Sequence, residues 1–349
     1  MDLTSGWGDS AGPNTAVRRL VRLVFAPAWA VLALVAALSA VGYVPPVSAQ
    51  YALLVGSALF LGLPHGAFDH LVVPRARGNE ITSRSLIAVG GLYALLGGGY
   101  AVVWFFAPDV AFVGFLLVTW VHWGLGDLAA IVLVADRTHL VGRGRRFLTA
   151  AVRGGIPMVV PLVAAPVAYR TVSENVVSLF GTEPTLGWLF APELRAALGV
   201  GFLCLTVAAL VAGRTGVTDG ATRSSWRLDA GETVLLWVFF AVVPPVLAIG
   251  LYFPLWHSAR HLVRVALLDA PTTAALSEAR DGPALERLAR DGAPMTFGGL
   301  ALFGILALAL PAGVATVEGL AGAYLVLLAV LTVPHVVVVS RVDRLQRVW

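Results

Sequence analysis

Lysine is absent from this chain of 349 residues, and cysteine occurs only once, at Cys204. A single thiol excludes an intramolecular disulfide and any metal cluster built from cysteines. Charged residues make up only 13% of the sequence, against about a quarter in a soluble globular domain. The 24 basic residues are therefore all arginines, and the formal net charge is +4. These shortages argue against a soluble protein and against one stabilised by disulfides.

Apolar residues are correspondingly abundant. They account for 58% of the sequence, and the mean hydropathy is +0.84. Runs of about 20 apolar residues recur along the chain, and each is long enough to cross a ~30 Å hydrocarbon layer. The sequence therefore predicts an all-α, polytopic membrane helix bundle in the cell membrane. We expect one membrane domain over residues 1–349, with a disordered polar tail at 1–16.

The apolar runs predict about ten transmembrane segments. Each is bounded by polar or Arg-bearing residues, although the eighth is short and partly polar, and a re-entrant segment is the alternative there. The predicted segments are 23–44, 51–74, 86–107, 110–134, 147–168, 195–213, 232–250, 253–268, 296–311 and 318–339.

Arginine marks alternate connections between these segments. Connections on the cytoplasmic side of a membrane carry an excess of basic residues, so a count of ten places both termini in the cytoplasm. The same pattern indicates membrane orientation and no nucleic-acid partner. The long connection 269–294 is predicted to be cytoplasmic, either as an amphipathic helix on the membrane surface or as a solvated connector.

Six of the seven histidines lie in predicted membrane segments, and all four segments that carry them are even-numbered. Under the predicted topology these segments run in the same direction, so their histidines are expected at related depths. A group of ionisable residues inside a membrane indicates a functional site. The seventh, His139, lies in the Arg-rich loop 135–146 and is predicted to be solvated. The six are His65, His70, His122, His257, His261 and His335.

His257 and His261 are the most informative pair, because residues four apart share one face of a helix. Two imidazoles in an apolar segment need a common polar partner, and a metal ion satisfies both. Neutral imidazole suits iron, zinc, copper and nickel.

Three charged residues lie close in sequence to the histidines. Two are acids that could accept a hydrogen bond from a ligating imidazole, and the third is an arginine. Asp69 lies four residues after His65, and Asp127 lies five after His122. Arg260 either neutralises one of these acids or extends its charged end to the membrane surface.

Four blocks of sequence resemble the Brp/Blh family, the membrane β-carotene 15,15′-dioxygenases of microbes that use rhodopsins. The resemblance covers residues from about 50 to 340, with several histidine blocks in the expected order. The blocks are His65-Gly66-Ala67-Phe68-Asp69-His70, Trp120-Val121-His122-Trp123, Trp256-His257-Ser258-Ala259-Arg260-His261-Leu262 and Pro334-His335-Val336-Val337.

The resemblance implies a non-haem Fe(II) enzyme that cleaves the central double bond of β-carotene with O2, giving two molecules of retinal. The retinal would supply a rhodopsin, with direct hand-over as one route. By motif, the iron would be held by His65, His122, His257 and His261. His70 and His335 would then support these ligands.

A lipid-soluble substrate implies an apolar tunnel, for which Phe68, Trp120, Trp123 and Trp256 are candidate wall residues. Two other functions fit part of the pattern. A membrane di-iron desaturase or hydroxylase also uses intramembrane histidines, but two irons need about eight, against the six here. A metal transporter would place histidines along a conduction path, but the chain lacks matched halves with symmetric broken helices.

Overall fold

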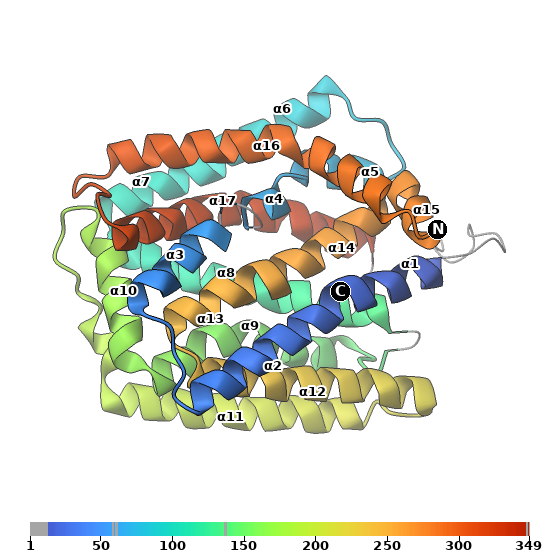
Figure 1. Ribbon diagram of the computed structural model, residues 1–349, viewed down its shortest axis with the longest axis horizontal. Helices are drawn as coiled ribbons and strands as arrows, with labels where there is room; N and C mark the ends of the chain where they lie inside the picture. The colour runs from blue at the N-terminus through green and yellow to red at the C-terminus, as the bar shows by residue number, and fades with distance from the viewer. Residues whose placement is uncertain (1–12, 58, 60–61, 136–137, 347, 349) are drawn as a thin grey trace.

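The computed structural model describes residues 13–349 except 58, 60, 61, 136, 137, 347 and 349, and for residues 13, 14 and 65 it describes only the backbone. The described residues form helices and connecting turns without strands. Most helices run along the long axis of the molecule (Figure 1). The all-helical membrane architecture predicted from composition is confirmed.

The N-terminal half contains short helices interrupted by π-helical turns, followed by two long helices. These elements are α1 (Pro13–Leu20), η1 (Val21–Phe25), α2 (Ala26–Ala40), α3 (Val47–Ser57), α4 (Leu63–Gly66), α5 (Asp69–Ala76), α6 (Ser83–Leu92), η3 (Tyr93–Gly97), α7 (Gly98–Phe106), α8 (Pro108–Val134) and α9 (Arg143–Ala164).

The C-terminal half alternates long helices with a segmented one. Its elements are α10 (Pro166–Ser178), η4 (Leu186–Phe190), α11 (Pro192–Arg214), α12 (Gly220–Val242), α13 (Pro245–Tyr252), η5 (Phe253–Ser258), α14 (Ala259–Leu268), α15 (Ala270–Ser277), α16 (Asp281–Ala309) and α17 (Val317–Leu345).

Seven helical stretches of the described chain are long and apolar enough to cross a membrane. Each overlaps one of the ten predicted segments. They are Thr15–Ala40, Ser83–Phe106, Pro108–Val134, Arg143–Ala164, Pro192–Arg214, Asp281–Ala309 and Val317–Leu345.

The other three predicted segments are interrupted or carry charge. Segment 51–74 is divided among α3, α4 and α5, because Pro64 and the turn at residues 67–68 break the helix. Segment 232–250 is split before Pro245, and segment 253–268 begins with the π-helical turn η5. Proline and π-helical turns are common causes of such breaks.

Two further boundaries differ from the predictions. Helix α1 begins at Pro13, inside the predicted tail, and Ala16 is fully buried; residues 1–12 lie outside the described part. The predicted connection 269–294 contains α15 and the first turns of α16.

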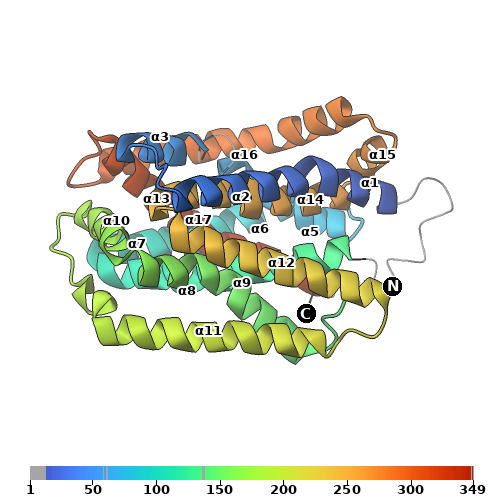
Figure 2. The same ribbon diagram turned by 60° about the horizontal axis from the view of Figure 1, so that its bottom comes forward.

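The segmented and buried helices lie in the middle of the bundle. Helices α8, α13, α14 and α17 lie between α16 on one side and α11 on the other in both views (Figures 1 and 2). The start of α1 and the end of α17 lie toward the same end of the molecule (Figure 1).

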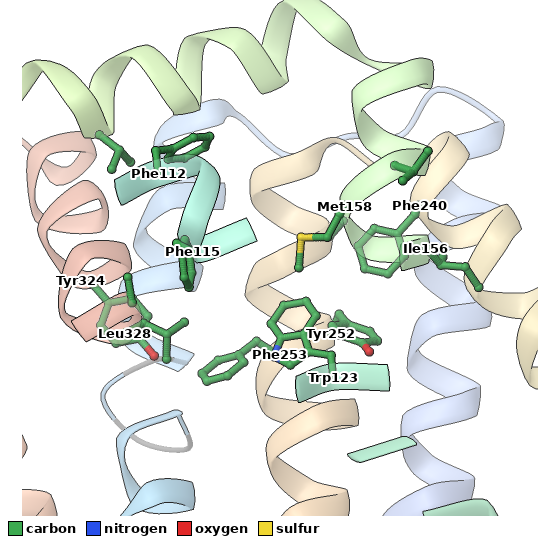
Figure 3. Packing of buried hydrophobic residues seen from close by; sticks show 14 of the residues in the cluster. Phe112, Phe115, Trp123, Ile156, Met158, Phe240, Tyr252, Phe253, Tyr324 and Leu328 are labelled. Carbon is green, nitrogen blue, oxygen red and sulfur yellow. The ribbon is translucent and has the colours of Figure 1, made fainter. Parts of the chain in front are cut away.

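Helices α8 and α9 approach each other at two glycines. A Cβ atom on Gly124 would lie 2.0 Å from the Ala150 carbonyl oxygen, and one on Gly154 would lie 1.9 Å from the Trp120 carbonyl oxygen. Only glycine permits this approach, as is common where membrane helices cross. Aromatic side chains fill the adjoining core, including Trp123, Tyr252 and Phe253 (Figure 3). This packing fixes the position of α8, which carries His122.

Candidate metal centre

Helix irregularities surround the histidines. Pro254 lacks an N–H donor, and the Ala259 N–H donates to the Pro254 carbonyl, five residues back, which is the π-helical pattern. The resulting turn η5 carries His257 and leads directly into α14, which carries His261. Pro334 lies inside α17 immediately before His335. His257 thus lies in a π-helical turn, a feature that is frequently functional, and His335 follows a proline within a continuous α-helix.

His122 and His257 lie in direct contact. Their Nε2 atoms lie 3.1 Å apart, and both side chains are 3% exposed. The planes of Trp123 and Phe253 lie nearly parallel, and their ring centroids are 5.4 Å and 6.0 Å from that of His257. The imidazole of His257 is therefore held against an aromatic wall that excludes water.

His335 connects this pair to an acidic group. Its ring centroid lies 4.8 Å from that of His122, and its Nδ1 lies 2.9 Å from both carboxylate oxygens of Asp69. The hydroxyl of Tyr93 donates to Asp69 at 2.6 Å. A carboxylate on Nδ1 orients an imidazole so that its Nε2 is available as a ligand.

His261 completes the cluster, with its ring centroid 5.1 Å from that of His335. Ligand atoms of Asp69, His261 and His335 all lie within 4.8 Å of one another. A void of about 10 Å³ touches His122, His257 and His261, and this is roughly the volume of one small guest such as a water molecule.

The donor set fits a metal ion. Two imidazole nitrogens bound at about 2.0–2.1 Å to one ion lie roughly 3 Å apart when they occupy adjacent positions, and the observed separation in the His122–His257 pair is 3.1 Å. Nitrogen donors with one nearby carboxylate suit a first-row transition metal.

The first block contributes two further predicted residues, His65 and His70. The side chain of His65 lies outside the described residues, although its backbone belongs to α4. His70 is half-buried and lines a large cavity together with Asp69 and His335.

The four candidate tunnel residues have different surroundings in the described structure. Trp123 borders a small apolar cavity. Trp120 instead donates its indole N–H to the Ala151 carbonyl at 2.8 Å. Phe68 and Trp256 are buried in the packed interior, and Trp256 donates to Asp127 at 3.0 Å. For Phe68, Trp120 and Trp256, a role as a tunnel wall stays a prediction.

The larger cavity has a volume of about 390 Å³ and the smaller about 90 Å³. The larger one lies among α4, α5, α6, α16 and α17, and reaches Asp69 and His335 of the cluster. The smaller one lies among α3, α8, α9, α10, α13 and α17, and reaches Trp123 beside His257. Leu328 lines both cavities.

A buried network of charges lies on the other side of Trp256. Asp127 faces Arg153 and Arg260 at 3.6 Å each, which fits the predicted pairing of Arg260 with an intramembrane acid. Arg260 also pairs with Glu232, and its guanidinium lies 3.8 Å above the Trp256 ring.

The network also contains three residues that were not predicted from the sequence: Arg153, Asp229 and Glu232. Arg153 binds the two acids at 3.0 Å and 2.9 Å. A signal was present, because an arginine in the middle of an apolar segment needs a buried acidic partner.

The prediction that His139 is solvated is wrong. Its side chain is fully buried, with Nδ1 2.9 Å from the Ser225 hydroxyl and Nε2 3.3 Å from Asp229. The loop that carries it folds inward over α12, and its arginines had suggested a solvated connection. His139 therefore belongs to the charged network.

Comparison with known proteins places the chain in a family. Residues 56–343 match the family model described as beta-carotene 15,15′-dioxygenase. The chain is 46% identical over 334 residues, 95% of either chain, to a protein of Halobacterium salinarum named probable beta-carotene 15,15′-dioxygenase Blh.

Two further relatives agree. A second Halobacterium salinarum protein, named probable beta-carotene 15,15′-dioxygenase Brp, is 31% identical over 88% of either chain. A protein of an uncultured marine bacterium, named beta-carotene 15,15′-dioxygenase, is 24% identical over 58% of this chain and 65% of its own. No solved structure matches. The histidine blocks, the buried cluster and these comparisons agree that the chain belongs to the β-carotene 15,15′-dioxygenase family.

Proposed function

We propose that this protein cleaves β-carotene at its central double bond with O2. The C15=C15′ bond breaks, each of the two carbons receives one oxygen atom, and two molecules of retinal form without a further reductant. The observation that carries the proposal is the convergence of three buried histidines and one partly buried histidine, His261, from three separate helical segments. Together with the family, it favours an oxygenase over the di-iron and transporter alternatives.

The cofactor we propose is one Fe(II) ion held by His122, His257 and His261, with His65 as the fourth ligand implied by its motif. His335 lies within the same cluster and is a further candidate ligand. When bound, such an ion supplies the redox chemistry that activates O2.

The protein's own residues position the reacting groups and keep water out. Asp69 holds the His335 ring through Nδ1, and Tyr93 holds Asp69. The aromatic wall of Trp123 and Phe253 keeps the neighbourhood of His257 apolar. Fixing ligands through hydrogen-bonded neighbours is how proteins tune a metal site.

We also propose ten membrane crossings with both termini in the cytoplasm of a multi-pass cell-membrane protein. In addition to the seven long spans, α12 has 23 residues, and the continuous elements α13, η5 and α14 have 8, 6 and 10 residues; at ~1.5 Å per residue each of these two stretches is long enough to cross the bilayer. The broken segment 51–74 would be the tenth crossing. The common position of the start of α1 and the end of α17 supports an even number of crossings. A protein so placed takes β-carotene from the lipid and can pass retinal to a rhodopsin.

Pigment analysis tests the proposed activity. Expression of the chain in a host that makes β-carotene should deplete β-carotene and produce retinal, with a ratio approaching two retinal molecules for each β-carotene consumed. The matched His122→Ala variant should leave β-carotene intact. Retinal formation that is equal in the two strains, or absent from both, would contradict the proposal.

A further inference from the structure

We propose that the two cavities beside the histidine cluster are the two arms of one binding channel. The larger cavity admits the substrate from the lipid, and the smaller one receives its leading end and sets how far it advances. The inference rests on the proposed function, since its occupant is the long, symmetric hydrocarbon β-carotene.

The larger cavity lies at the membrane-facing surface of the bundle. Its walls include Gly90 of α6 and Met295, Gly298 and Leu302 of α16, two helices with little buried surface. Met295 and Leu302 are 51% and 48% exposed. A cavity walled by exposed apolar residues of peripheral helices is open to a hydrocarbon arriving sideways through the bilayer.

The inner end of the larger cavity is polar. Asp69, Tyr93 and His335 line it, whereas the rest of the wall is mostly glycine and aliphatic side chains. A hydrocarbon that fills the cavity from the membrane therefore ends against the histidine cluster.

One cavity alone does not hold the whole substrate. Its volume of about 390 Å³ lies toward the lower end of the ~300–1,000 Å³ typical of ligand pockets, whereas the substrate has two bulky rings and a long polyene. Central cleavage requires equal lengths of substrate on both sides of the reacting bond. A second apolar space beyond the cluster is therefore needed.

The smaller cavity is placed to be that space. It is almost wholly apolar, lies next to the His257 wall at Trp123, and shares Leu328 with the larger cavity. Leu328 is a flexible aliphatic residue between the two arms, so a change of its rotamer connects them. Val172, Val246 and Ile249 line this second arm, so the size of their side chains sets how far the leading ring travels.

Filling the near arm should block all substrates. A Cβ atom on Gly90 or Gly298 would have no atom within 4 Å, so Gly90→Leu and Gly298→Leu place a side chain in the cavity without forcing the helices apart. Each should lower retinal formation about tenfold or more.

The matched controls are Gly91→Leu and Gly304→Leu, on the same two helices. Their added Cβ atoms also have no atom within 4 Å, but neither residue lines the cavity. Both should retain activity near wild type. Loss of activity equal to that of the cavity variants would overturn the role of the near arm.

Larger side chains in the smaller cavity should reduce cleavage of a long substrate more than cleavage of a shorter one. Val246→Phe and Val172→Phe extend into the smaller cavity, and the control Val167→Phe changes an 80% exposed residue of α10. The probes are β-carotene, with two rings, and β-apo-8′-carotenal, which keeps one ring and the central bond but has a shorter second half that ends in an aldehyde and lacks the second ring.

Far-arm variants should lose cleavage of β-carotene at least about tenfold more than cleavage of the apocarotenal, which is the range over which a pocket discriminates by shape. Equal effects on the two substrates, or none on either, would overturn the inference. Two variants are used because overpacking one buried site can destabilise the protein; the amount of folded protein normalises each rate.

The inference and the proposed function fail in different ways. A wild-type chain that makes no retinal from β-carotene sinks the proposed function. If the wild-type chain makes retinal but the cavity-filling variants are indistinguishable from their controls, only the two-arm channel is contradicted.

Discussion

Two groups of buried polar side chains meet at η5, and they are built differently. In the charged network, Arg153 and Arg260 alternate with Asp127, Asp229 and Glu232, so each charge has an opposite one within 3.6 Å or less. In the histidine cluster, imidazoles lie beside one another, and the carboxylate of Asp69 lies at the edge on His335.

We interpret the charged network as structural and the histidine cluster as functional. Charges that pair with one another need no further partner and hold helices together, whereas adjacent imidazole nitrogens are suited to bind a metal ion. Trp256 joins the two groups, because its indole donates to Asp127 while the next residue is His257. The network thus fixes the π-helical turn on which the cluster depends.

The strongest test of this distinction removes a histidine. His257→Ala should abolish retinal formation and bound iron while the protein still inserts and folds, because the site loses a ligand but no ion pair. Retinal analysis and metal content check this in one preparation. Carotenoid cleavage that persists in the variant would remove His257 from the site.

Breaking the charged network should instead destabilise the folded protein. Arg153→Met leaves Asp229 without an arginine partner and Glu232 with Arg260 alone, and breaking a buried pair in this way costs about 3–5 kcal/mol. Thermal unfolding in detergent should therefore occur well below the wild-type temperature.

The control for Arg153 is Arg170→Gln, in a pair with Glu174 whose side chains are 50% and 37% exposed. Exposed pairs contribute little, about 0–1 kcal/mol, so its unfolding temperature should stay close to wild type. If the two substitutions have equal effects, the network is not what stabilises the bundle.

An intermediate effect is expected at the edge of the cluster. Asp69→Asn keeps the size of the side chain but removes the charge that orients His335, and loss of such a partner weakens metal binding about 10–100-fold. Titration of the apoprotein with Fe(II) measures the change. Unaltered affinity would show that Asp69 has no part in supporting the ligands.

The smallest effect is expected for His139. His139→Ala removes the partner of Ser225 and Asp229, and a buried polar group left unpaired costs about 1–3 kcal/mol. The variant should unfold at a lower temperature, while retinal formed per folded molecule stays at the wild-type level. A stability equal to wild type would contradict the buried position, and a loss of specific activity would link the network to catalysis.

Hydropathy predicted the helical membrane architecture, and the histidine blocks predicted the family. Both signals are local, since an apolar run or a His-x-x-x-His pair is visible in one stretch of sequence. Segment interruptions were harder to foresee, because the helix break after Pro64 and the π-turn at Phe253–Ser258 depend on how neighbouring helices satisfy the freed backbone.

Long-range pairing accounts for the other differences. His139 appeared solvated because its loop is rich in arginine, but it packs against Asp229, 90 residues away. Likewise, His335 meets Asp69 across 266 residues. Such contacts depend on the tertiary fold, and no local sequence pattern indicates them.

The number of iron ions bound to each chain tests the central claim most directly. The purified protein, reconstituted with Fe(II) without oxygen and freed of excess metal, should hold one iron per chain, and the His122→Ala and His257→Ala variants should hold almost none. Two irons per chain in the wild type would indicate the di-iron class instead. Metal that washes out of wild type and variants alike would contradict a resident iron at the histidine cluster.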